Sequence, residues 1–212
     1  MNRRQFLIMV AALVLLVAAG AAMLLSERSA WKPGDARIGT RLVPELRIDD
    51  VAAIRIRESG ATLTLTRGGE GWRAAERPDA AVDVGQVREL LLLLTALKIV
   101  QVETIAPVMK EKLRLVDPGD APGAGAGTVL ELNDVSGKAL VRLLLGSVVM
   151  KPGESTGQYS GTPAGRRVLL DSEQGIVGVV SESLTQVSAK ADPWIVVEPP
   201  KLAPEKSPAR KN

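Results

Sequence analysis

The longest unbroken apolar stretch of the chain is residues 6–25, FLIMVAALVLLVAAGAAMLL, which contains no charged residue and no proline. As an α-helix, a stretch of this length measures about 30 Å, the thickness of the hydrocarbon core of a bilayer. A helix satisfies its backbone hydrogen bonds internally, so such a segment can span lipid alone. The pattern therefore predicts that residues 1–25 form a short N-terminus and a transmembrane anchor.

The charges beside this stretch predict its orientation. Arg3 and Arg4 precede it, whereas Ser26, Glu27 and Arg28 follow it with no net charge. Because Lys and Arg are retained on the cytoplasmic side, the N-terminus is expected inside and residues 26–212 outside. We thus expect a single-pass protein of the bacterial inner membrane whose bulk lies in the periplasm.

Two alternatives for the same stretch remain open. Ala19-Gly20-Ala21 has the small-x-small form of a signal-peptide cleavage site, and Arg3-Arg4-Gln5-Phe6-Leu7 has the form of a twin-arginine export signal. Signal peptides usually have apolar cores of about 7–15 residues, and this run is longer. The length favours a retained anchor, inserted in the ordinary way.

Residues 26–47 mix charge, Gly and Pro without periodicity, and we interpret them as a juxtamembrane linker. Its Trp31 fits either the membrane interface or packing on the domain. From residue 48 onward, apolar and polar residues alternate with period two, as in Ile54-Arg55-Ile56-Arg57. This alternation, broken by Gly-containing turns, predicts a three-stranded meander that ends near Trp72.

A helix is predicted over residues 84–98, with Asp83 as its N-cap. A stripe of six apolar residues recurs at helical spacing, whereas Leu92 and Leu93 fall outside it and give the helix additional leucine surface. A strand over residues 99–104 and a short helix over residues 109–116 complete a first unit, residues 48–116. The stripe consists of Val84, Val87, Leu90, Leu91, Leu94 and Leu97.

Residues 117–127, DPGDAPGAGAG, are predicted to be a linker between two units. Their glycines resemble a phosphate-binding loop only superficially, because such a loop follows a strand, opens a helix and carries Lys-Ser/Thr. Here a strand pattern follows and no such dipeptide is present. We therefore expect no nucleotide site.

A second β-rich unit is predicted over residues 128–197, with two strands joined by a hairpin, a polar loop, two further strands and a short helix. These elements cover residues 128–133, 139–145, 151–165, 167–170, 176–180 and 183–187. Both units place strands before a helix, without the alternation that builds a parallel sheet. The predicted fold class is α+β, an N-terminal transmembrane helix followed by two antiparallel β-meander/helix units, with a disordered Pro/Lys tail at residues 198–212.

The net charge of +3 belongs to the two ends of the chain. Residues 1–28 carry three Arg and one Glu, and residues 198–212 carry three Lys, one Arg and two Glu, so each end has a charge of +2 and residues 29–197 have −1. With one Tyr, one Phe and three Trp, the chain also lacks a stacking surface for bases. We expect no nucleic-acid partner.

The chain contains no Cys and no His. This composition excludes disulfides, thiol nucleophiles, the serine triad and the commonest metal ligand. Asp49 and Asp50 are the one adjacent acidic pair considered, and neighbouring residues of a strand or turn point apart. We expect no enzymatic activity and assign no catalytic, cofactor-binding or metal-binding residue.

The chain resembles the bacterial domain-of-unknown-function 4340 family over nearly all of residues 1–197. The matching motifs are NRRQFL at 2–7, DDVAAIRI at 49–56, GW at 71–72, GAGAGTVLEL at 123–132, LLLG at 143–146 and DPW at 192–194. The resemblance implies an anchored, extracytoplasmic β-rich domain associated with ABC-type transport systems, without catalytic residues. Members continue beyond the residue equivalent to Trp194, so it also implies a short or truncated member.

These observations predict a non-catalytic accessory or interaction module of an ABC-type transport complex. The expected partners are the membrane, through residues 6–25, and a membrane protein that the additional leucine surface of residues 84–98 contacts. Two alternatives remain, namely an extracytoplasmic ligand-binding domain with convergent polar groups in a pocket, or an exported soluble protein after signal cleavage.

Overall fold

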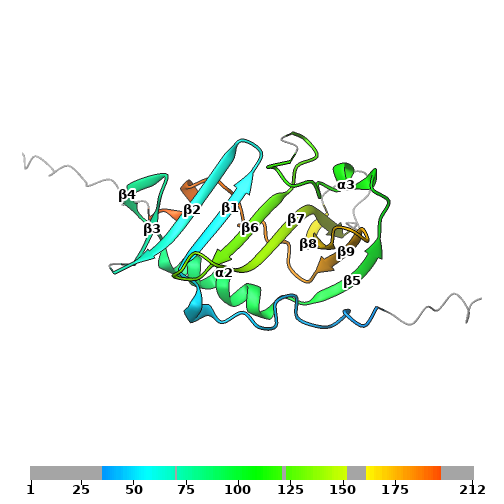
Figure 1. Cartoon of the computed structure of the whole chain (residues 1–212), viewed down its shortest axis with the longest axis horizontal. Helices are drawn as coiled ribbons and strands as arrows, with labels where there is room; N and C mark the ends of the chain where they lie inside the picture. The colour runs from blue at the N-terminus through cyan, green and yellow to red at the C-terminus, as the bar shows by residue number, and fades with distance from the viewer. Residues whose placement is uncertain (1–34, 70, 121–122, 152–160, 197–212) are drawn as a thin grey trace, which may run out of the picture. The chain divides into compact units, whose positions relative to one another are not determined.

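A single antiparallel sheet contains the nine strands of the described chain. The computed structural model describes residues 35–69, 71–120, 123–151 and 161–196 (Figure 1). The strands lie side by side in the order β4-β3-β2-β1-β6-β7-β8-β9-β5. They are β1 (Ala53–Glu58), β2 (Ala61–Gly68), β3 (Gly71–Ala74), β4 (Arg77–Ala81), β5 (Ile99–Thr104), β6 (Thr128–Asn133), β7 (Ala139–Lys151), β8 (Thr162–Asp171) and β9 (Ile176–Val180). The helices are α2 (Val84–Ala96), α3 (Met109–Lys112) and the short 3-10 helices η1 (Ile48–Asp50) and η2 (Asp192–Trp194).

The period-two alternation sets the two faces of the sheet. In the β1–β2 hairpin, Ile54 pairs with Leu65 and Ile56 pairs with Leu63, and all four side chains are fully buried. Arg55 and the other intervening residues point to the opposite face, because side chains alternate along a strand. The predicted turn between these strands is confirmed.

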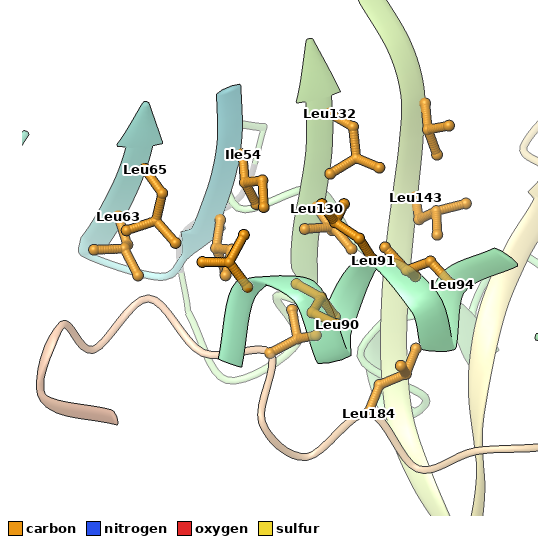
Figure 2. Close-up of a cluster of buried hydrophobic side chains, with 14 of the residues drawn as sticks. Ile54, Leu63, Leu65, Leu90, Leu91, Leu94, Leu130, Leu132, Leu143 and Leu184 are labelled. Carbon is orange, nitrogen blue, oxygen red and sulfur yellow. The ribbon is translucent and has the colours of Figure 1, made fainter. Parts of the chain in front are cut away.

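Helix α2 covers the apolar face of the sheet. Its Val87, Leu90, Leu91 and Leu94 are buried, at the spacing expected for one face of a helix. Figure 2 shows Leu91 and Leu94 of α2 directed at Leu130 of β6 and Leu143 of β7. The predicted N-cap is confirmed, since Asp83 Oδ1 accepts hydrogen bonds from the backbone N–H groups of Gly85 and Gln86.

The predicted fold class of two separate β-meander/helix units is wrong. β1 pairs with β6 in antiparallel register from Ala53↔Asn133 to Arg57↔Val129, so both predicted units belong to one sheet. If the two units were separate, β1 and β6 would each be an edge strand with a row of unpaired backbone N–H and C=O groups. Pairing β1 with β6 satisfies the backbone groups of both strands. Residues 117–127, predicted as a linker, connect two parts of the same sheet. The structure is mostly antiparallel β-sheet.

The C-terminal segment, residues 181–196, closes the apolar face (Figure 1, orange). It starts at the end of β9 and contributes the buried side chains of Leu184, Val187 and Trp194 to the core. At its far end it reaches the opposite edge of the sheet, where the Asp83 backbone N–H donates to the Trp194 carbonyl at 2.8 Å. The segment therefore joins the last strand to the start of α2.

The buried Arg166 of β8 holds this segment in place. Its guanidinium donates to the Gly146 carbonyl (3.0 Å), the Leu184 carbonyl (2.8 Å) and Thr128 Oγ1 (3.0 Å). Burial lowers the pKa of Arg166, and the nearby Glu58 carboxylate opposes this shift. Leu184 has a φ of 49°, a left-handed conformation, and residues 183–187 form no helix. The predicted helix there is wrong because the bound carbonyl fixes a non-helical backbone.

Part of the predicted linker 26–47 is packed onto the domain. The backbone N–H of Gly39 donates to the Ile99 carbonyl at 2.7 Å, and that of Leu42 donates to the Leu97 carbonyl at 2.8 Å. Leu42, Val43 and Leu46 also pack against the core. Residues 37–47 thus cover the start of the edge strand β5. Trp31 and the rest of residues 26–34 lie outside the described residues.

The membrane location is also corrected. In the part of the chain that the structure describes, no helix has both the length and the apolar character needed to cross a membrane. The longest, α2, has 13 residues and measures about 20 Å, against about 30 Å for the hydrocarbon core. This finding contradicts the predicted single-pass inner-membrane protein with a periplasmic domain. The predicted anchor itself, residues 6–25, lies outside the described residues, as does the predicted tail 198–212.

We predict that Arg166→Met lowers the free energy of unfolding by about 3 kcal/mol, because the carbonyls of Gly146 and Leu184 lose a buried donor. Urea denaturation measures the change. Arg47→Met is the matched control, since Arg47 is exposed and its one ion pair with a described residue is with Asp50 at 3.5 Å, and the substitution is expected to cost less than about 1 kcal/mol. Equal urea midpoints for the two variants would show that Arg166 does not hold the C-terminal segment.

Candidate functional site

Two open grooves lie on opposite faces of the sheet. The α2 groove runs between α2 and the β2–β3 hairpin and has a volume of about 640 Å³. The loop groove lies between the other sheet face and the α3 region and has a volume of about 470 Å³. The α2 groove is lined by Ile48 and Asp49, by Arg67, Gly68, Gly69, Gly71 and Trp72, and by Val84, Val87, Arg88, Leu91 and Leu92.

One wall of the α2 groove is a stripe of three exposed side chains on α2. Val84, Arg88 and Leu92 follow one another at intervals of four residues, so they lie on one side of the helix. Val84 is 52% exposed and Leu92 is 49% exposed. The neighbouring Leu93, which was also expected to add free leucine surface, instead packs against the core. The additional apolar surface of α2 is therefore Leu92 together with Val84.

The other wall is the β2–β3 hairpin. Arg67 pairs directly with Trp72 across these two strands, so both side chains point to the same face of the sheet. Trp72 is half-buried and packs against the core. Gly71 has a φ of 117°, and a Cβ added at Gly69 or Gly71 would meet no atom within 4 Å. The glycines thus leave the hairpin backbone uncovered beside the indole ring.

The charged side chains of this groove have no charged partner among the described residues. Among the described residues, Arg67, Arg88 and Asp49 form no ion pair, although most other arginines do. Asp50, the neighbour of Asp49, points elsewhere and pairs with Arg47 at 3.5 Å. The groove therefore combines an apolar floor with two unpaired guanidinium groups and one unpaired carboxylate.

The loop groove has a different character. Its floor is formed by Val129, Leu144 and Leu169, from the sheet face opposite α2. Charged residues line its rim, but Lys110 Nζ already donates to the Ser172 carbonyl at 2.9 Å. Asp117 and Arg142, also at the rim, pair with each other. Most of its polar groups are therefore bound within the chain.

Asp117 and Arg142 belong to a charged network on the solvent side of the sheet. Arg55, Glu131 and Arg142 lie directly opposite one another on β1, β6 and β7. Glu131 Oε1 accepts from Arg142 Nε at 3.0 Å and from Arg57 Nη2 at 3.2 Å. Asp117 joins the network from the loop. Five side chains thus connect three strands to the segment that contains Asp117.

The network contains three guanidinium groups and two carboxylates, so it is not fully neutralised. Glu131 and Asp117 are each 15% exposed at the side chain. Arg57 Nε is buried and, in the described part of the chain, is the one buried side-chain nitrogen or oxygen without a hydrogen-bond partner. Since the carboxylates bridge several arginines, the arrangement fixes the loop onto the sheet.

The glycine run at residues 123–127 has a packing role. A Cβ on Gly127 would lie 2.5 Å from the Arg114 carbonyl oxygen and 2.7 Å from that of Leu145. Gly127 N–H donates to the Val116 carbonyl at 2.8 Å. Only glycine lets the segment approach the neighbouring backbone this closely.

Asp134 lies in a turn and lines neither groove. Asp134 Oδ1 accepts from Ser136 and from the Lys138 backbone N–H in the β6–β7 hairpin. The Ser136 hydroxyl, followed by the Lys138 N–H, holds the pKa of Asp134 below its ordinary value. In the described residues, no group of three or more His, Cys, Asp or Glu side chains is placed to hold a metal ion.

Searches against protein-family models, curated proteins and solved structures returned no match for this chain. The resemblance to the domain-of-unknown-function 4340 family is therefore untested and stays an expectation.

We predict that Glu131→Gln lowers the free energy of unfolding by about 1–3 kcal/mol, because three guanidinium groups lose a shared, largely buried anion. Urea denaturation measures this change, with Glu89→Gln on the exposed side of α2 as the matched control. Glu89 makes no ion pair with a described residue, so its substitution is expected to change stability by less than about 0.5 kcal/mol. An equally small effect at Glu131 would mean that the network does not stabilise the fold.

Proposed function

We propose that this chain is a non-catalytic interaction module that binds an apolar segment of a partner protein in the α2 groove. The observation that carries the proposal is the position of Val84 and Leu92, each about half exposed, beside the half-buried Trp72 in one groove. Exposed apolar groups gathered in a groove are typical of binding surfaces. Aromatic residues at the centre of such surfaces often contribute most of the binding energy.

The groove is formed by elements that are packed and paired within the fold. α2 is capped by Asp83, and its inner face is packed between the sheet and the C-terminal segment. Trp72 lies on a strand that is paired on both sides. Because neither wall needs to be ordered on binding, a partner segment loses only its own conformational freedom.

The absence of a catalytic step is part of the proposal. The chain has no His and no Cys. The two carboxylates that lie closest to other charged groups, Asp117 and Glu131, are engaged in ion pairs with arginines. Acid–base chemistry by carboxylates needs a pair of groups that is free to exchange protons with a substrate.

The loop groove is the alternative site, and it would serve a ligand-binding domain. A small-molecule site needs convergent polar groups that are available to the ligand. In the loop groove, Asp117, Arg142 and Lys110 already have partners within the chain. This comparison favours the α2 groove as the functional surface. The family resemblance supplies the class of partner, a subunit of an ABC-type transport complex.

We predict that Leu92→Glu weakens partner binding by about tenfold or more, because it removes a leucine contact and introduces a charge into the apolar groove. Tagged full-length chains carrying Leu92→Glu, Val135→Glu or no change are expressed in host cells, and co-purifying proteins are quantified by mass spectrometry. Val135 is the matched control, since it is 93% exposed in the β6–β7 hairpin and lies outside both grooves.

The expected result is a protein recovered with the unchanged chain and with Val135→Glu, but depleted with Leu92→Glu. Thermal unfolding of purified Leu92→Glu should match the unchanged chain, because the side chain is half exposed. Equal recovery from all three chains would contradict the proposal. If the depleted protein is not a transport subunit, the proposed interaction module stands, but the proposal that its partner belongs to a transport complex is wrong.

A further inference from the structure

We infer that the segment bound in the α2 groove is acidic as well as apolar, with a carboxylate placed between two aliphatic side chains. This inference rests on the proposed function and adds the chemistry of the partner. The order of side chains along α2 supports it. Arg88 lies between Val84 and Leu92, one helical turn from each.

The spacing of this stripe defines what the partner has to present. Val84 and Leu92 are eight positions apart, which is about 12 Å along a helix, and Arg88 lies about 6 Å from each. A partner helix matches this spacing when two leucines stand two turns apart with an acidic residue one turn after the first. A second carboxylate, on the side facing the hairpin, would reach Arg67 beside Trp72.

Because both arginines are unpaired in the described part of the chain, the groove complements a partner that carries negative charge. Elsewhere in the sheet, Arg55, Arg57 and Arg167 each have a carboxylate partner within 4 Å. Arg67 and Arg88 have none among the described residues. Asp49 contributes one negative charge, so the described residues that line the groove have a net charge of +1. Partner carboxylates would neutralise the groove and would orient the bound segment.

The same charges argue against occupants from this chain itself. Residues 1–28 and residues 198–212 each carry a net charge of +2, so neither end complements the two arginines. A second copy docking the same stripe symmetrically would bring equivalent surfaces together, and Arg88 would approach Arg88. Like charges at such a contact oppose association. An acidic segment of a different protein fits best.

The test uses three synthetic helical peptides that share leucines at the matching positions and differ only in the residues that face the arginines. These residues are Glu in the first peptide, Gln in the second and Lys in the third. Each peptide is labelled with a fluorophore and titrated with the full-length chain, and the dissociation constants are measured by fluorescence anisotropy. The variants are Arg67→Gln/Arg88→Gln, the control Arg41→Gln/Arg47→Gln outside the groove, and Leu92→Glu.

The Glu peptide is expected to bind the unchanged chain about tenfold more tightly than the Gln peptide, from two partly exposed charge pairs. The Lys peptide is expected to bind most weakly. The difference between Glu and Gln should disappear in Arg67→Gln/Arg88→Gln, persist in Arg41→Gln/Arg47→Gln, and shrink as NaCl is raised, because salt screens exposed pairs. Leu92→Glu should weaken all three peptides.

The two proposals fail in different ways. If the Gln or Lys peptide binds as well as the Glu peptide, and Leu92→Glu abolishes that binding, the acidic inference is overturned and the apolar interaction module stands. If no peptide binds, or if Leu92→Glu leaves binding unchanged, both proposals are overturned. A charge preference that survives Arg67→Gln/Arg88→Gln also overturns the inference, because the preference then arises elsewhere on the chain.

Discussion

The structure depends on the covering of one sheet face that is much larger than α2, the one long helix among the described residues. Nine strands span about 38 Å across the sheet, whereas α2, with 13 residues, measures about 20 Å. Uncovered leucines would remain in contact with water, so irregular chain has to complete the layer. Residues 37–48 cover one part and the C-terminal segment covers another, and Arg166 binds the latter through its Leu184 carbonyl. The layer opposite the sheet is therefore mostly non-helical.

The elements with clear periodicity could be predicted from the sequence, and their assembly could not. Strands β5, β6 and β9, the hairpin at Gly60 and the Asp83 cap follow from local patterns and are present as predicted. The pairing of β1 with β6 joins residues far apart in the chain, and no local pattern records it. β4 was missed because Arg77–Ala81 contains a proline and does not alternate. The predicted helix at residues 183–187 is absent because Arg166, which is distant in the sequence, binds the Leu184 carbonyl and fixes the backbone there.

The candidate site could be predicted on one wall only. Leu92 and Leu93 fall outside the helical stripe, and together they predicted additional apolar surface on α2; of the two, Leu92 is exposed and Leu93 packs against the core. The second wall, Arg67 and Trp72, lies beside α2 only in the folded chain, where the β2–β3 hairpin and α2 line the same groove. Their chemistry is visible in the sequence, but their proximity depends on the fold. Asp117 was placed in a linker for a similar reason, since Arg57 and Arg142 surround it only once β1, β6 and β7 are adjacent.

The path of the C-terminal segment has a consequence for how the chain is made. Trp194, one of the largest fully buried side chains, is synthesised after every strand of the described sheet, and its carbonyl closes the turn that begins α2. While the ribosome is still translating residues 181–196, the leucines of α2 and β7 lack part of their cover. The core can be completed only after residues 181–196 have left the ribosome. Long-range closure of this kind slows folding and leaves apolar surface exposed to aggregation until residues 181–196 are in place.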